Sequence, residues 1–302
     1  MCGVAGIFLK RGTERLGPKL VEMLKLIHHR GMDSSGLALY APPRPGRYYC
    51  RVAVQDEKAG IQLKALLARA AGVEPGILEG TNSSQKVYTA VLEAEDTEID
   101  RVYREIDSRA ESCVHSLSSS LLVVKDLGEA GNLNHARYLE QFPARHGLAH
   151  VRLATESIDN LNYAHPFTSP IYPSLSIAHN GQLTNYFNLR RKLERQGIYF
   201  KTNNDSEVIA HYLAYRVRKD GKTLMEAMHL AMDDLDGVFS CIVGTEQEMG
   251  IFQDRLGLKP ILVHELPDMV LLGSEQICFA GQAVQTGESW EIKPGEAVVW
   301  SH

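Results

Sequence analysis

The chain opens with MCGVAGIF (residues 1–8), which places a cysteine second and a β-prone apolar run directly behind it. We expect methionine aminopeptidase to remove Met1, because that enzyme accepts only small second residues such as cysteine. Cys2 would then carry both a thiol and a free α-amine. Since the usual pKa of an α-amine is about 7.7–8.0 and that of a cysteine about 8.5, the amine can accept the thiol proton near neutral pH. This arrangement is typical of an N-terminal nucleophile.

Composition places the chain among soluble globular proteins. It has 302 residues, of which 44% are hydrophobic and 23% charged, which excludes a disordered chain, a collagen-like repeat and a coiled coil. The length allows two domains or one large one. A net charge of 32 − 37 = −5 without a basic stripe argues against a nucleic-acid partner.

No segment has the features of a membrane span or a secretory signal. The longest uncharged run, residues 166–189, contains many polar residues and three prolines, unlike the roughly 20 apolar residues of a transmembrane helix. The N-terminus lacks a basic region before its short apolar run. The five cysteines include no C-x-x-C pair, so we expect no metal site. A cytoplasmic protein without a membrane partner follows.

Periodicity and turn residues predict an α+β fold with antiparallel strands. Helices are predicted over residues 16–27, 61–71, 98–108, 185–195, 206–218 and 224–235. Strands are predicted over residues 4–9, 37–40, 48–54, 86–93, 121–125, 176–178, 238–244, 250–254, 261–264, 270–273 and 297–300. Asn180-Gly181 and Asp236-Gly237 have the composition of turns, and either Asp205 or Ser206 can cap the helix that follows.

Two regions carry further expectations. The hydrophobic periodicity is less regular over residues 41–146. We interpret this stretch as a small α/β insertion or an elaboration of the main domain. The basic residues of the helix predicted at 185–195 are expected to form its solvated face; they are Arg190, Arg191, Lys192 and Arg195.

Seven short motifs follow one another in a fixed order. They are RGMDSSG (30–36), HVRLAT (150–155), AHNGQLTN (178–185), NDSEV (204–208), LDG (235–237), DxxGxKP (254–260) and GSE (273–275), and they come after residues 1–8. In this order they resemble class II glutamine amidotransferases, which are N-terminal-nucleophile hydrolases. The resemblance covers most of the chain outside residues 41–146. It implies a four-layer αββα sandwich and a single domain, residues 1–302, with an insertion at about 41–146.

The resemblance also implies roles for individual residues. Cys2 attacks the side-chain amide of L-glutamine, forming a γ-glutamyl thioester and releasing ammonia. The Asn180 side chain and the Gly181 backbone N–H form the oxyanion hole. Because a guanidinium can bind a carboxylate through two hydrogen bonds, Arg152 is suited to the α-carboxylate of glutamine. Thr155 adds a hydroxyl donor, and Asp205 holds the α-ammonium group.

Other polar residues of the motifs are expected to support the structure. Arg30 and Asp33 are interpreted as a buried pair that supports the N-terminal loop. His165 and His179 are interpreted as structural histidines.

The chain contains no recognisable domain that would use ammonia, so we expect a partner chain. Residues 154–157, 164–167 and 290–295 resemble the stand-alone amidotransferase subunit of glutamate-synthase-like systems, including the N-methylglutamate synthase A subunit. In such systems the partner synthase chains carry FMN and iron–sulfur centres, whereas no cofactor is expected in this chain. We therefore expect the protein to form a hetero-oligomer with these partner chains.

Two alternatives remain open. The chain could act as an amidase or transferase on another γ-glutamyl amide, such as γ-glutamylmethylamide. It could instead be a non-catalytic regulatory subunit that binds glutamine.

Overall fold

The computed structural model describes residues 1–71, 78–81, 85–135, 139–153, 160–282 and 287–302. The helices are α1 Leu16–Leu26, α2 Glu57–Ala71, α3 Asp96–Asp107, α4 Tyr186–Arg195, α5 Asp205–Arg218 and α6 Leu224–Asp234, with short 3₁₀ turns η1 His28–Arg30, η2 Ala130–His135, η3 Leu161–Tyr163 and η4 Gln276–Phe279. The strands are β1 Gly3–Leu9, β2 Ser34–Tyr40, β3 Arg47–Val54, β4 Leu78–Thr81, β5 Lys86–Glu93, β6 Ser112–Ser118, β7 Leu121–Leu127, β8 His146–Arg152, β9 Phe167–Ser169, β10 Tyr172–Leu183, β11 Gly237–Gly244, β12 Glu248–Gln253, β13 Leu262–Glu265, β14 Met269–Gly273, β15 Glu288–Glu291 and β16 Ala297–Ser301.

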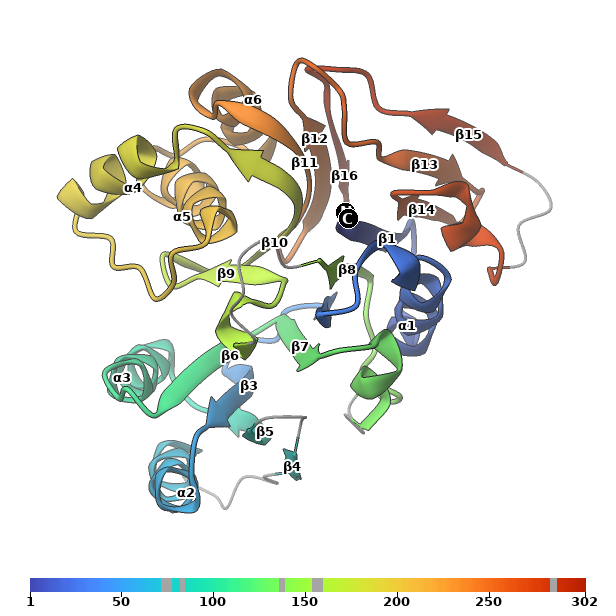
Figure 1. Cartoon of the computed structure of the whole chain (residues 1–302). Coiled ribbons are helices and arrows are strands. Elements are labelled where there is room, and N and C mark those ends of the chain that lie inside the picture. The colour runs from blue at the N-terminus through green and yellow to red at the C-terminus, as the bar shows by residue number, and fades with distance from the viewer. Residues whose placement is uncertain (72–77, 82–84, 136–138, 154–159, 283–286) are drawn as a thin grey trace.

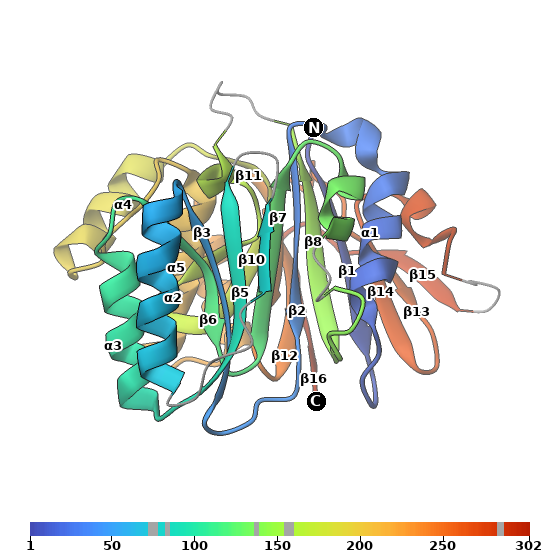
Figure 2. The same ribbon diagram turned by 90° about the horizontal axis from the view of Figure 1, so that it is seen from below.

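Two antiparallel sheets form the centre of the molecule. The larger sheet has seven strands in the order β15-β13-β14-β1-β8-β2-β7, and the smaller has five in the order β16-β12-β11-β10-β9. Fully buried side chains of both sheets pack in one cluster between them, such as Val4 and Leu148 from the larger sheet and Ile242 and Ile251 from the smaller. Figure 2 shows the two chain termini at opposite ends of this sandwich.

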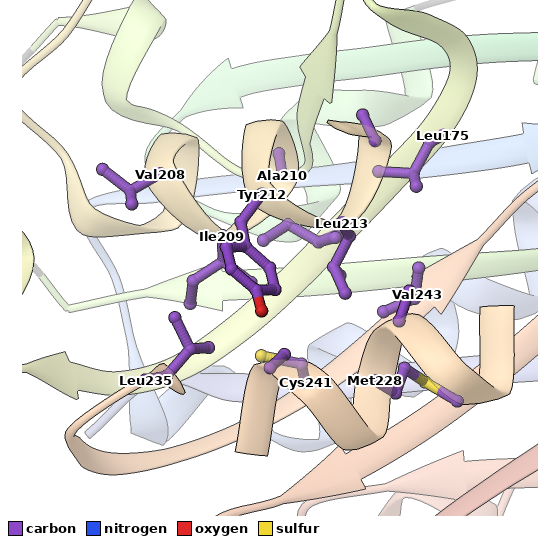
Figure 3. Packing of buried hydrophobic residues seen from close by; sticks show 14 of the residues in the cluster. Leu175, Val208, Ile209, Ala210, Tyr212, Leu213, Met228, Leu235, Cys241 and Val243 are labelled. Atoms are coloured by element: carbon purple, nitrogen blue, oxygen red, sulfur yellow. The ribbon is translucent and has the colours of Figure 1, made fainter. Parts of the chain in front are cut away.

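Helices cover the outer face of each sheet (Figure 1). Helix α1 buries Leu20 and Leu24 against the larger sheet. On the other side α5 and α6 pack on the smaller sheet, and Figure 3 shows Leu213 and Met228 in this layer beside Cys241 of β11. The resulting order of layers is helix, sheet, sheet, helix, which confirms the predicted α+β sandwich. Within the described part of the chain, no helix is long and apolar enough to cross a membrane.

The stretch predicted as an insertion, about 41–146, is not one unit in the structure. Strands β3 to β6 form a separate four-stranded sheet in the order β4-β5-β3-β6, and α2 and α3 bury their apolar side chains against it. Strand β7, by contrast, pairs with β2 in the seven-stranded sheet, and η2 packs under α1. The separate sheet therefore extends only from Arg47 to Ser118.

The basic residues of α4 do not all lie in solvent as predicted. Arg191, Lys192 and Arg195 are exposed. Arg190 instead donates from Nη1 to the carbonyl of Thr202 at 2.8 Å, and its guanidinium lies 4.7 Å from the centre of the Phe200 ring. Arg190 therefore ties α4 to the segment before α5.

Tyr40 connects the two central sheets through its hydroxyl group. From β2 the fully buried side chain reaches the smaller sheet, where its hydroxyl donates to the carbonyl of Gly244 at 2.8 Å and lies 2.6 Å from Ser176 Oγ. A side chain on Gly244 would meet the Tyr40 ring at 2.5 Å, so only glycine permits this approach.

We predict that Tyr40→Phe lowers the free energy of unfolding by about 1–3 kcal/mol, because it leaves two buried polar groups without their shared partner. Urea denaturation followed by circular dichroism measures the change. Tyr199→Phe is the matched control, since Tyr199 is 78% exposed and should tolerate the same change. Equal stability of the two variants would contradict a stabilising role for the Tyr40 hydroxyl.

Candidate active site

Cys2 lies at one end of the sandwich, directly before β1. The pairing of Gly3 with Val151 in the adjacent strand β8 places Cys2 beside Arg152. The Cys2 Sγ lies 3.8 Å from the carbonyl oxygen of Leu153, and Arg30 Nε donates to the Cys2 carbonyl at 2.9 Å. Backbone pairing and these contacts together fix the position of a residue that is second in the chain.

The environment of Cys2 has two opposing effects on its ionisation. Burial raises the pKa of the thiol above its usual value. A hydrogen bond with the backbone of Leu153 and the positive charges of the N-terminus, Arg152 and Lys259 lower that pKa, but by less than burial raises it. Because the thiol is the dominant form at neutral pH, nucleophilic attack by Cys2 requires a nearby base.

The predicted turn at Asn180-Gly181 is wrong, because both residues lie inside strand β10 and pair with Ser240 and Phe239 of β11. Glycine is needed here for close packing. Gly181 has a φ of 151°, and a Cβ atom on it would lie 2.0 Å from the carbonyl oxygen of Val238. At the second predicted turn, Asp236-Gly237, Asp236 directly precedes β11 and Gly237 is the first residue of that strand.

The Asn180 side chain is 2% exposed, and its amide nitrogen Nδ2 has no hydrogen-bond partner among the described residues. A buried amide group without a partner costs about 1–3 kcal/mol. It is therefore a donor available to a ligand oxygen.

Asp205 is the first residue of α5 and not its cap. The cap is Asn204, whose side chain accepts from Ser206 N at 2.8 Å. The Asp205 carboxylate is thus free to extend to the end of β10, where Oδ2 accepts from Leu183 N at 2.9 Å. Its other oxygen, Oδ1, lies 3.7 Å from His179 Nδ1. Asp205 therefore places a negative charge close to the strand that carries Asn180.

Three buried histidines connect the strands that carry the site residues. His150 Nε2 donates to the carbonyl of His179 at 2.9 Å, which links β8 to β10 across the two sheets. The His165 ring stacks on that of His150 at 3.9 Å. Ser206 Oγ lies 2.8 Å from His179 Nδ1 and 3.2 Å from His165 Nε2. His165 and His179 thus occupy positions that fit the structural role expected of them, whereas the contribution of His150 was not predicted.

Burial keeps these histidines uncharged. It lowers the pKa of His150 to about 3, and it lowers the pKa of His165 and His179 below the usual value as well. The hydrogen bond from His150 requires the tautomer protonated at Nε2, so the cluster has a defined arrangement at neutral pH.

The predicted pairing of Arg30 with Asp33 needs correction, since the carboxylate that Arg30 contacts is that of Glu275. Arg30 Nη1 lies 2.5 Å from Glu275 Oε1, and the adjacent Ser274 accepts from Val4 N at 2.9 Å through its hydroxyl oxygen. Residues 273–275 therefore support the start of β1, a role that the motif alone did not reveal.

Five of the six predicted site residues lie in the described part of the chain, and they come from both central sheets and from the start of α5. Arg152 ends β8 beside Cys2, and Asn180 and Gly181 lie in β10 across the sandwich. Asp205 reaches β10 from α5. Thr155 lies outside the described residues. Among the described residues, no group of three or more His, Cys, Asp or Glu side chains is placed to hold a metal ion.

Comparison with known proteins identifies the family. Residues 150–280 match a family model described as a glutamine amidotransferase domain. A protein of Methanothermobacter thermautotrophicus named "Putative glutamine amidotransferase" is 33% identical over 99% of this chain and 99% of its own length. The glutamine amidotransferase-like protein GlxB of Rhizobium meliloti is 34% identical over 100% of this chain and 99% of its own length.

A solved structure agrees with the fold. The glutamine phosphoribosylpyrophosphate amidotransferase of B. subtilis superimposes with a TM-score of 0.64 at 22% identity. The match covers 99% of this chain but only 47% of that one, so the chain spans about half of that enzyme. The chain described here belongs to the glutamine amidotransferases and is an enzyme of this type.

Proposed function

We propose that this chain hydrolyses the side-chain amide of L-glutamine, with Cys2 as the nucleophile after removal of Met1, and that the ammonia passes to a partner synthase chain. The observation that carries the proposal is the buried amide nitrogen of Asn180, which has no hydrogen-bond partner in the described part of the chain. Burying this amide without a hydrogen bond costs free energy. That cost is removed when Nδ2 donates to an oxygen that becomes negatively charged during the reaction.

The proposed chemistry needs only groups at the end of the sandwich. The α-amine of Cys2 takes the thiol proton, and the sulfur attacks the side-chain carbonyl carbon of glutamine. Asn180 Nδ2 and the Gly181 N–H donate to the resulting oxyanion. When this intermediate collapses the C–N bond breaks, the proton moves from the amine to the leaving nitrogen, and ammonia departs. Water then hydrolyses the thioester to glutamate and restores the thiol.

Recognition of the amino-acid head group needs one charge of each sign. We assign the α-carboxylate of glutamine to Arg152, which ends the strand next to Cys2, and the α-ammonium to Asp205. Thr155 is proposed to add a hydroxyl donor to the carboxylate. The position of Asp205 at the start of α5, with its oxygen bound to Leu183 N at 2.9 Å, supports this assignment because the carboxylate is held in one orientation.

The ammonia acceptor is proposed to lie on a second chain of a glutamate-synthase-like hetero-oligomer. The two relatives with 33% and 34% identity are aligned over 99% of their length, so they too are amidotransferase units of about this size. FMN and iron–sulfur centres are proposed for the partner chains, with no cofactor in this one.

The first test is Cys2→Ala in the purified complex. We expect complete loss of glutamate and ammonia release, because alanine has no thiol to attack the amide. Intact-mass measurement of the wild-type protein should show that Met1 is absent. An active enzyme that retains Met1 would rule out the free amine as the base. A wild-type complex without any turnover, but with bound glutamine, would favour the non-catalytic regulatory alternative.

Asn180→Ala tests the oxyanion hole. We expect kcat to fall about 10²–10³-fold with a small change in KM for glutamine, because the lost donor acts mainly on the transition state. Steady-state glutaminase assays measure both constants. A fall confined to KM would assign Asn180 to substrate binding instead.

Arg152→Lys tests the head-group assignment and the identity of the amide. We expect kcat/KM for glutamine to fall about 10–100-fold through KM, since lysine cannot form two parallel hydrogen bonds to the carboxylate. The same loss is expected with γ-glutamylmethylamide, which has the same head group. Faster turnover of this second amide by the wild-type enzyme would favour the alternative substrate.

A further inference from the structure

The motif at residues 254–260 forms a rigid turn next to the active site. Asp254 organises it, since Oδ1 accepts from Leu256 N at 2.7 Å and Gly257 N at 3.2 Å, and Oδ2 accepts from Phe239 N at 2.8 Å. Gly257 has a positive φ of 66° and a Cβ atom on it would lie 2.5 Å from the Pro294 ring, so glycine is required there. The proposed glutamine chemistry assigns no role to this turn.

The turn carries Lys259 to the N-terminus. Its carbonyl accepts from Gln253 Nε2 at 2.8 Å, which fixes the backbone, and its Nζ lies 3.5 Å from the sulfur of Met1. The Lys259 ammonium therefore lies next to the residue whose removal exposes the Cys2 amine. Among the described residues, no carboxylate lies within ion-pair distance of it to neutralise its charge.

The positive charge of Lys259 affects the ionisation of Cys2, before β1, and of His179, in β10. It lowers the pKa of the Cys2 thiol on the β1 side, although burial has the larger and opposite effect. On the β10 side it lowers the pKa of His179, after the larger effect of burial and against the negative charge of Asp205. The ammonium of Lys259, which lies against Met1, is therefore within electrostatic reach of both Cys2 and strand β10.

The other charged groups around Cys2 are already committed or belong to the substrate site. Arg30 from η1 is paired with Glu275, which also lies 3.2 Å from His29 Nε2. Arg152 from β8 is assigned to the substrate carboxylate, and Asp205 from α5 to the substrate ammonium. Among the residues that the structure describes, Lys259 is thus the cation that remains to act on the proposed nucleophile when glutamine is bound.

We propose that Lys259 is a positioning residue for the N-terminal nucleophile, whose ammonium keeps the Cys2 α-amine unprotonated and stabilises the thiolate. This proposal rests on the proposed function for its catalytic meaning. A positive charge destabilises a second positive charge nearby and stabilises a negative one, so both effects increase the fraction of Cys2 that can react at neutral pH.

The test measures Cys2 reactivity directly, without glutamine. Processed wild-type and Lys259→Met proteins are alkylated with iodoacetamide from pH 6 to pH 10, and mass mapping quantifies the Cys2 peptide. We expect the rate at pH 7 to fall about three- to tenfold in Lys259→Met and the rate curve to move to higher pH. Lys259→Arg, which keeps the charge, should restore the wild-type curve.

Arg255→Gln is the matched control. Arg255 lies in the same turn and its loss changes the net charge equally, but its side chain is 75% exposed and bound to Asp233 at 2.6 Å. We expect the Cys2 alkylation curve of Arg255→Gln to match that of the wild-type protein. Superimposable curves for Lys259→Met and wild type, or an equal shift in Arg255→Gln, would overturn the proposal.

Glutamine turnover provides the second readout. In Lys259→Met the acidic limb of the kcat/KM profile should move to higher pH, with activity recovering at alkaline pH, because the amine must lose its proton before it can act. A loss that is equal at every pH would indicate a merely structural role and would overturn the proposal. If wild type has no glutaminase activity the proposed function fails, whereas the alkylation curves still decide the effect of Lys259.

Discussion

The position of β1 in the middle of the seven-stranded sheet is the constraint on which the site depends. The first residues of a chain usually fray, because they lack partners on one side. Here β1 starts at Gly3 and pairs with β8 on one side and β14 on the other, and Ser274 and Arg30 hold its beginning from neighbouring segments. Cys2 can therefore be second in the chain and still have a defined position.

A second requirement is that the two separate sheets keep a constant position relative to each other, since the proposed nucleophile adjoins one and the proposed oxyanion donors lie on the other. Hydrogen bonds cross the sandwich from the His150 ring to the backbone of β10 and from the Tyr40 hydroxyl to the backbone of β11. Burial holds the pKa of His150 at about 3, so this contact does not change over the neutral pH range. Uncharged contacts across the sandwich thus hold the two sheets in a fixed relation.

Sequence reasoning identified the family and the order of the layers, because these depend on local patterns and on short motifs with unusual residue combinations. The roles of the six site residues stay predictions. Sequence reasoning failed where a local preference was overridden by tertiary pairing. Asn180-Gly181 is a common turn sequence, yet β11 pairs with it and the glycine serves close packing. Arg30 pairs with Glu275, some 245 positions along the chain, which no local pattern indicates. For the same reason β7 could not be assigned to the main sheet from residues 41–146 alone.

The net charge of −5 has little bearing on catalysis at this site. Glutamine carries one charge of each sign at its head group, so a uniform field would attract one and repel the other. The arrangement around Cys2 separates the signs: cations from β8 and from the turn at residues 254–260 lie near the nucleophile, and the carboxylate of Asp205 lies near β10. Such fixed, local charges stabilise a thiolate and an oxyanion without reorganisation during the reaction. These charges are carried by backbone elements that the sandwich holds in place, so their positions relative to the Cys2 sulfur are set by the fold.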